Sequence, residues 1–461
     1  MLSLESTIAW YVFLIVMVWS FQRLTRCFTQ LNIFSLFLAF LVLRHGITVP
    51  FDHDVNEWYA GISLQPRSFD RFYTSLVVMW LCLLVGAWLG RLMFGRGVLN
   101  VATLRHEMTS RRITPGMSQP LFLVALGISV GLVMVYQLRF DVGLLQLLSG
   151  KLTAVDYYDM RASFGAATHW TAGVGERLAS IARFGLFPFF ICTLYFMRER
   201  GLLWRVLFWM VLGLGLVVGL LSGQKTASVF LVIGVVVAAY LRAGRLTLRL
   251  SDWRIWALAA VGWFGVLPYL YHLQYPDEDY ARLLGITSYR ISSEYDRSLQ
   301  LYFEVYPDIQ PHLYGHSSAL INTVLGTPVA ADMLPERFIP TYYIGSNYEN
   351  TWNACFVGVA WVDFGYAGVA LESMFVGLLL QGYARWFLKA RKTALVMGTQ
   401  VGLMMAATRL SEVALTSALL SFGLLSTFLM FYVVRRHVWQ PQPRGVELQV
   451  LAKLVTTTQA I

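Results

Sequence analysis

Long apolar stretches, separated by short polar connections, run through almost the whole chain. Positions 206–221 and 226–241, on either side of the string Ser222-Gly223-Gln224-Lys225, contain no charged residue. A helix needs about 20 mostly apolar residues to cross a bilayer. The pattern predicts about eleven membrane-spanning helices, at residues 7–22, 31–49, 72–90, 119–138, 179–197, 203–221, 226–242, 253–272, 365–384, 394–409 and 413–434.

The composition supports this prediction. Of the 461 residues, 57% are hydrophobic and only 13% are charged, whereas charged residues make up about a quarter of a soluble domain. We therefore expect an all-α polytopic membrane protein. The first stretch has no basic start and no cleavage-site pattern, so we interpret it as a retained helix.

Basic residues predict the orientation of the helices. Every second connection is rich in arginine and lysine, beginning with Arg23 and Arg26. Such connections stay in the cytoplasm, which predicts a periplasmic N-terminus and a cytoplasmic C-terminus. The formal net charge of +10 is then a topology signal, and it gives no reason to expect nucleic acid as a partner.

Two predicted outer connections are long, and long loops without a span of their own are usually functional. They divide the chain into N-terminal helices (1–138), a first periplasmic loop (139–178), central helices (179–272), a second periplasmic loop (273–364), C-terminal helices (365–437) and a cytoplasmic tail (438–461). Residues 351–361 are apolar but too short to span, which is typical of a re-entrant segment. Residues 299–306 have the pattern of a helix on the membrane surface.

Several charged residues lie at or near the ends of apolar stretches, where a charge needs a partner. Lys225 at the start of a helix favours an anionic guest such as a phosphate. Arg409 and Glu412 are three residues apart, so they can pair with each other, or Arg409 can clamp an anion opposite Lys225. If residues 290–297 are helical, Arg290, Glu294 and Arg297 share one face. Glu372 can be functional or can be a structural partner of Arg183 or Arg44.

The four cysteines, Cys27, Cys82, Cys192 and Cys355, are spread along the chain. No disulfide framework and no metal-ligand spacing can be drawn from them. We interpret them as small apolar side chains. Asp52-His53-Asp54 has metal-ligand residue types, but its adjacent spacing is a weak signal.

Two segments together resemble the Wzy-type polymerases of oligosaccharide repeat units. The first is the basic helix start Ser222–Ser228. The second is the segment 350–373, in which an asparagine-rich start leads to Phe364-Gly365-Tyr366-Ala367-Gly368 and then to Glu372-Ser373. The order of the helices and the two large loops also match. Some members have an Arg-x₁₀-Gly pattern in both loops, and here only the first loop matches it, at Arg139 and Gly150.

The resemblance implies a GT-C-like glycosyltransferase on the periplasmic face of the bacterial inner membrane. Such a protein polymerises undecaprenyl-diphosphate-linked oligosaccharides into an exopolysaccharide or O-antigen. Such a protein needs no nucleotide sugar, no metal and no other cofactor. The resemblance also implies a chain-length co-polymerase as a partner. A single displacement would invert the anomeric carbon.

This chemistry needs fixed positive charge for the leaving diphosphate and a general base for the acceptor hydroxyl. The candidates for diphosphate binding are Arg161, Lys225, Arg290, Arg297 and Arg409. The candidates for the catalytic base are Glu294, Asp296, Glu349, Asp363 and His316.

Three other functions remain open at this stage. A lipid-phosphate-sugar transferase of the other GT-C branch begins with a cytoplasmic N-terminus and an acidic first outer loop; Asp52-His53-Asp54 fits the loop, but the predicted periplasmic N-terminus does not fit. An O-antigen ligase uses the same donor but transfers it to lipid A core, and His312 or His316 could serve its chemistry. A flippase or transporter of lipid-linked sugars usually keeps its charges in a central cavity and its outer loops short. This chain instead has long predicted outer loops that carry many of its charges.

Overall fold

The computed structural model describes residues 3–27, 29–54, 61–95, 113–139, 178–221, 225–245, 257, 260–272, 277–318, 322, 333–345 and 352–435. Within these residues the chain is helical, and its β-structure is limited to one bridge between Met117 and Arg435. Five helical segments are long and apolar enough to cross a membrane. They are Leu4–Thr25, Pro66–Phe94, Leu178–Arg200, Leu202–Gly219 and Phe356–Lys389. These segments agree with the predicted polytopic membrane protein.

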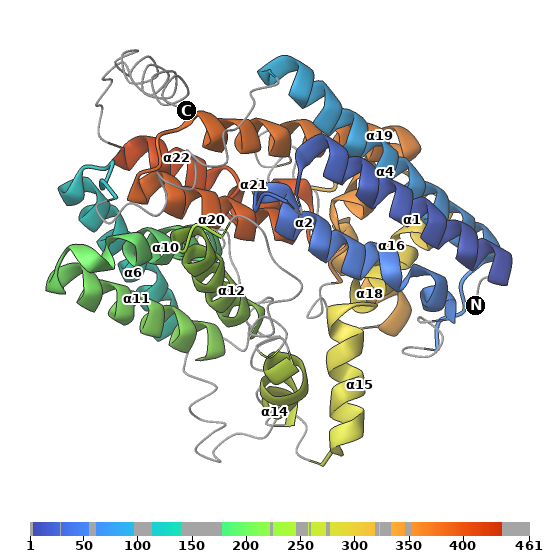
Figure 1. The fold of residues 1–461 in the computed structure, drawn as a ribbon. Helices are drawn as coiled ribbons and strands as arrows, with labels where there is room; N and C mark the ends of the chain where they lie inside the picture. Colours follow the sequence, from blue (N-terminus) through green and yellow to red (C-terminus); the bar gives the residue numbers. More distant parts are fainter. Residues whose placement is uncertain are drawn as a thin grey trace, which may run out of the picture.

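The helices follow the predicted apolar stretches closely (Figure 1). The first half contains α1 (Leu4–Thr25), α2 (Ile33–Val42) with the π-helix η1 (Leu43–Ile47), η2 (Val49–Asp54), α4 (Pro66–Phe94) and α6 (Gln119–Arg139). The middle contains η3 (Ile181–Leu186), α10 (Phe187–Met197), η4 (Arg198–Arg200), α11 (Leu202–Leu221), α12 (Lys225–Arg242), η5 (Gly262–Val266) and α14 (Leu267–His272). The last part contains α15 (Tyr280–Ile291), α16 (Glu294–Val305), α18 (Pro335–Ile344), α19 (Phe356–Lys389), α20 (Ala394–Thr408), η7 (Arg409–Ser411), α21 (Leu415–Leu420) and α22 (Ser426–Val434).

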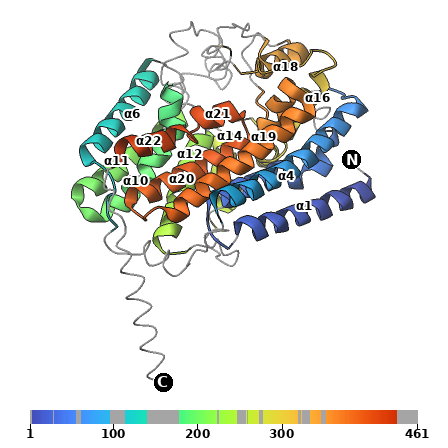
Figure 2. The same ribbon diagram turned by 90° about the horizontal axis from the view of Figure 1, so that it is seen from above.

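The closest helix pair is α4 with α19, which lie side by side in both views (Figure 1, Figure 2). Glycines permit this approach: a Cβ atom at Gly86 would clash with the Met374 carbonyl, and one at Gly377 would clash with the Leu83 carbonyl. Small residues at helix crossings let backbones meet and gain van der Waals contact, which is the main attraction between helices in lipid.

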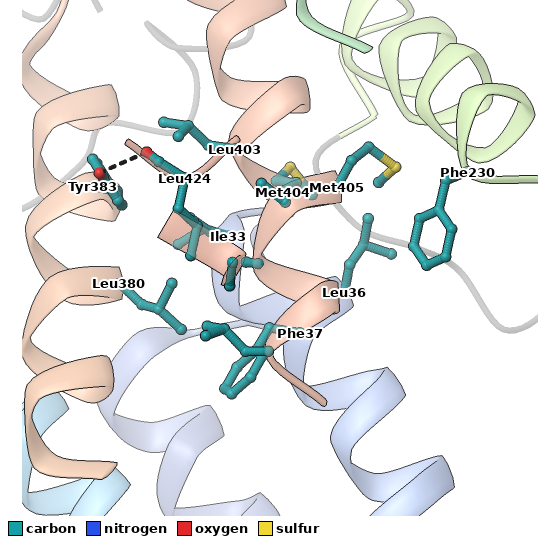
Figure 3. Close-up of a cluster of buried hydrophobic side chains, with 14 of the residues drawn as sticks. Ile33, Leu36, Phe37, Phe230, Leu380, Tyr383, Leu403, Met404, Met405 and Leu424 are labelled. Carbon is teal, nitrogen blue, oxygen red and sulfur yellow. Dashed lines mark hydrogen bonds between the residues drawn. The ribbon is translucent and has the colours of Figure 1, made fainter. Parts of the chain in front are cut away.

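Part of the apolar core lies where α2, α12, α19 and α20 meet (Figure 3). Its buried side chains include Ile33, Phe37, Leu380, Met404 and Leu403. The Tyr383 hydroxyl donates to the Leu424 carbonyl at 2.8 Å, so the polar end of this buried ring is satisfied. Such hydrogen bonding is expected of a buried tyrosine.

The segment predicted to lie on the membrane surface is instead inside the protein. In α16 every residue from Asp296 to Val305 is buried. The Glu304 carboxylate accepts a hydrogen bond from the Ser68 hydroxyl and another from the Gln65 backbone at the start of α4. Partners of this kind on the polar side of α16 allow an amphipathic sequence to be buried on both faces.

The predicted face of Arg290, Glu294 and Arg297 does not form, because two turn residues interrupt the helix. Ser292 and Ser293 separate α15 from α16, so Arg290 ends one helix and Glu294 begins the next. Figure 1 shows α15 extending away from the body of the molecule, while α16 lies within it.

Of the segment predicted to be re-entrant, residues 356–361 form the beginning of α19, which turns sharply before the long apolar part. Gly365 has a φ of +58°, a left-handed conformation that favours glycine. After the turn, Gly368 lies so close to Ala360 that a Cβ atom would clash with the Ala360 carbonyl. The motif Phe364-Gly365-Tyr366-Ala367-Gly368 therefore folds one helical arm back onto the other.

The predicted last span, 413–434, is divided into α21 and α22 by residues 421–425. Gly423 has a φ of +105° and lies directly against Gly185 of η3. The four cysteines are free, three of them buried and Cys82 half-buried, which agrees with their interpretation as small apolar side chains.

Candidate functional site

Two buried arginines share one carboxylate at the junction of η1, α16 and η7. Arg44 Nη2 lies 2.5 Å from Glu412 Oε1, and Arg409 Nη1 lies 2.5 Å from Glu412 Oε2. Arg44 Nη1 also donates to the Ser411 hydroxyl at 2.8 Å. Together with His45 and Asp296 these residues form what we call the arginine–carboxylate cluster. The predicted pairing of Arg409 with Glu412 is confirmed.

Aromatic rings hold both guanidinium groups in place. The Arg44 guanidinium lies 4.3 Å from the Tyr295 ring centre and 5.1 Å from that of Phe40. The Arg409 guanidinium lies 3.9 Å from the ring centre of Phe230, which stacks on Phe40. Cation–π contacts of this kind strengthen when water is excluded. The two positive charges are therefore fixed in direction and poorly hydrated.

His45 and Asp296 form a second pair in the same cluster. His45 Nδ1 lies 2.5 Å from Asp296 Oδ1, and both side chains are fully buried. His45 Nε2 lies 3.0 Å from the Ser411 carbonyl oxygen, which can only accept a hydrogen bond. Nε2 therefore carries a proton, and one further proton lies between Nδ1 and the Asp296 carboxyl. A shared proton of this kind suits a general acid or base.

The Asp52 carboxyl extends this pair, since it is close enough to Asp296 for the two groups to affect each other's pKa. Burial raises the pKa of Asp52 to about 8, and the negative charge of Asp296 adds to the rise. Burial also raises the pKa of Asp296 to about 8. Glu412 differs: burial raises its pKa, but Arg409 and Arg44 outweigh burial and hold that pKa below its usual range. Glu412 is therefore ionised, Asp52 retains its proton near neutral pH, and Asp296 shares one proton with His45.

The cluster carries a net positive charge. Arg44 and Arg409 contribute two positive charges against the one negative charge of Glu412, and the His45–Asp296 pair is neutral overall because its two members share one proton. A positive charge at this depth favours an anionic ligand. A diphosphate, with two charged groups, suits two arginine forks.

The cluster contains Asp296 and Arg409, each predicted separately from the sequence. Arg297 is the next residue of α16; it is buried and lies 4.3 Å from the ring centre of Trp352. Glu294 begins α16 and is half-buried. Arg290 does not join them, since it ends α15 beside the Tyr271 ring, 5.6 Å from its centre.

Lys225 is the first residue of α12, and its side chain lies outside the described part of the chain. Phe230, five residues further along α12, is the ring under Arg409. Five residues of helix rise about 7.5 Å, so the start of α12 lies near the arginine–carboxylate cluster. Arg161 and Glu349 lie outside the described residues.

His316 and Asp363 come together in a different group, at the turn of α19. The Asp363 carboxylate accepts from the Ser317 hydroxyl at 2.6 Å and from the Ser317 backbone at 3.1 Å. His316 Nδ1 lies 2.8 Å from the Asn322 side-chain oxygen. These bonds hold the loop 313–318 against α19. They give Asp363 a structural task, and its role as a base stays a prediction.

The sequence prediction missed three members of the site. The sequence predicts Arg44 only as a possible partner of Glu372 and Glu412 only as a partner of Arg409, and it assigns no role to His45. The proposed pairing of Glu372 with Arg44 does not form, because Arg44 contacts Glu412. The signal that could have identified Arg44 and His45 is their position just after α2, in which nine of the ten residues are apolar.

No known protein family, curated protein or solved structure matches the chain. The function must therefore be argued from the residues and their geometry.

Proposed function

We propose that this chain is an inner-membrane glycosyltransferase that polymerises undecaprenyl-diphosphate-linked oligosaccharide units on the periplasmic face, as an eleven-span protein of GT-C-like architecture. The arginine–carboxylate cluster is the observation that carries the proposal. It combines fixed positive charge with a shared proton, and these are the two groups that transfer from a lipid diphosphate requires.

In this proposal the leaving diphosphate replaces Glu412 as a partner of Arg44 and Arg409. Arginine binds phosphate through two parallel hydrogen bonds, and the surrounding rings keep the forks pointed at the ligand. Lys225, at the start of α12, adds a point charge. Stabilising the departing oxygens lowers the barrier to breaking the glycosidic bond to the lipid carrier.

The His45–Asp296 pair supplies the base. With the shared proton on His45, the Asp296 carboxylate accepts the proton of the acceptor hydroxyl, as the hydroxyl oxygen attacks the anomeric carbon and the diphosphate departs. Its raised pKa suits this task, because a base works best when its pKa is near the working pH. One displacement inverts the anomeric carbon.

The test is deletion of the gene in its host, followed by complementation and gel analysis of surface polysaccharide and lipid-linked intermediates. We expect Arg409→Ala and Lys225→Ala to leave single repeat units in place of polymer, with the protein still in the membrane. Arg282→Ala is the matched control, because Arg282 is 69% exposed and pairs with Glu278 at the surface.

The intermediates separate the other functions. Full-length polymer retained on the lipid carrier in the deletion strain would indicate a ligase. Repeat units trapped on the cytoplasmic side would indicate a flippase. Normal polymer in the Arg409→Ala strain would show that the arginine–carboxylate cluster is not the active site.

A further inference from the structure

A groove between α1 and α4 combines apolar walls with two arginines. It has a volume of about 430 Å³ and is lined by Trp19, Ser20, Arg23, Leu24, Leu84, Val85, Trp88 and Arg91. Figure 2 shows α1 along the edge of the molecule, beside α4. Both helices are long and apolar enough to cross a membrane. The groove therefore lies on a side of the protein that faces lipid if they do cross.

The groove lies at the level where both helices end. α1 ends at Thr25 and α4 at Phe94, and the guanidinium of Arg91 donates to the Leu24 carbonyl at 3.4 Å. Trp19 is 57% exposed and Trp88 is 50% exposed. Half-exposed tryptophans at the ends of spanning helices are typical of the lipid headgroup level.

Positive charge gathers at this groove without an acidic side chain among the described residues that line it. The Arg23 guanidinium lies 5.0 Å from the centre of the Trp19 ring. Arg385 of α19 is close enough to Arg91 for their charges to repel. Repelling guanidinium groups at a membrane surface favour a bound anion, and arginine forks suit phosphate.

We propose that this groove is a binding site for an anionic membrane phospholipid. The phosphate and headgroup contact Arg23 and Arg91, while an acyl chain lies against the apolar wall formed by Leu84, Val85 and Trp88. The apolar wall argues for a lipid over free phosphate, which has no apolar part to bury there. This site is separate from the arginine–carboxylate cluster, and the proposal stands whatever the chain catalyses.

The test measures lipid binding to the purified full chain in detergent by native mass spectrometry. Dioleoyl phosphatidylglycerol and dioleoyl phosphatidylcholine are compared, since they share acyl chains and differ in net charge. We expect tighter binding of phosphatidylglycerol. The double variant Arg23→Ala/Arg91→Ala should weaken that binding by roughly tenfold to thirtyfold, because each basic residue near a lipid surface contributes about a fivefold effect.

Two further variants make the result specific. Val85→Trp fills the groove and leaves both arginines in place, so it should also weaken phosphatidylglycerol binding. Arg200→Ala/Arg282→Ala removes the same charge from exposed positions elsewhere and should leave binding unchanged.

Other outcomes would overturn the proposal. Equal affinity for the two lipids would show that the groove is not an anionic lipid site. An unchanged preference for phosphatidylglycerol in the Arg23→Ala/Arg91→Ala protein would show the same. Full displacement of phosphatidylglycerol by millimolar inorganic phosphate would show that phosphate alone is the ligand.

Discussion

Glu412 contacts both guanidinium groups of the arginine–carboxylate cluster, so the stability of the cluster depends on this one carboxylate. It is 4% exposed, and each of its oxygens faces a different arginine. Buried ion pairs add little net stability when they are complete, because desolvation offsets the attraction. Removing one member is costly, since the remaining charge stays buried without compensation.

We therefore expect Glu412→Ala to lower the free energy of unfolding by about 3–5 kcal/mol. The double variant Arg409→Met/Glu412→Ala should recover part of this loss, because it also removes one buried positive charge. Thermal unfolding in detergent measures both. Glu278→Ala is the control, since Glu278 pairs with an exposed arginine. A Glu412→Ala protein that melts like the wild type would show that water reaches the two guanidinium groups.

Sequence reasoning identified charged residues of the site but not their partners. Asp296 and Arg409 stand out because charges are rare near apolar stretches. Their partners come from distant parts of the chain: His45 and Asp296 are 251 positions apart. No local pattern encodes such a contact, since it depends on how η1 and α16 meet in three dimensions.

At the scale of elements, the turn in α19 depends on two glycines with different tasks. Gly365 adopts a left-handed conformation, while Gly368 permits contact with the Ala360 carbonyl. The turn places Asp363 against the loop 313–318. These bonds therefore hold residues 313–318, from the middle of the second predicted loop, against α19.

We expect Gly368→Val to destabilise the protein by about 1–3 kcal/mol, the usual cost of forcing atoms into a filled space. Gly285→Ala in α15 is the matched control, because nothing lies within 4 Å of its added Cβ atom. That variant should be neutral or slightly stabilising, since alanine has a higher helix propensity than glycine. The two melting temperatures are compared in detergent. Equal melting temperatures would mean that the arms of α19 are not tightly packed.

Helices were predictable here, and their interruptions were not. Apolar length is a local property, so α1, α4, α11 and α12 follow directly from the sequence. The breaks at 292–293 and 421–425 depend on tertiary contacts, such as that of Gly423 with Gly185. The surface position expected for residues 299–306 failed for the same reason, since an amphipathic pattern does not show which protein surfaces will cover its polar side.

At the scale of the whole molecule, the placement of the basic residues predicts one orientation. Arg200 and Arg242 lie at helix ends on the predicted cytoplasmic side, whereas Asp277 lies in the predicted periplasmic part. The proposed function depends on this orientation, because undecaprenyl-linked units are polymerised outside the cytoplasm. An inverted protein could not carry out the proposed reaction.

The free cysteines make this orientation directly measurable. Cys27, Cys192 and Cys355 are buried, so Cys82→Ala gives a background with little reactive thiol. In that background we expect a membrane-impermeant maleimide to label Asp277→Cys in intact spheroplasts. It should label Arg200→Cys only after permeabilisation. Both positions are exposed, so accessibility within the protein does not differ. The reverse labelling pattern would show that the chain has the opposite orientation, with the arginine–carboxylate cluster in the cytoplasmic half. That result would exclude periplasmic polymerisation.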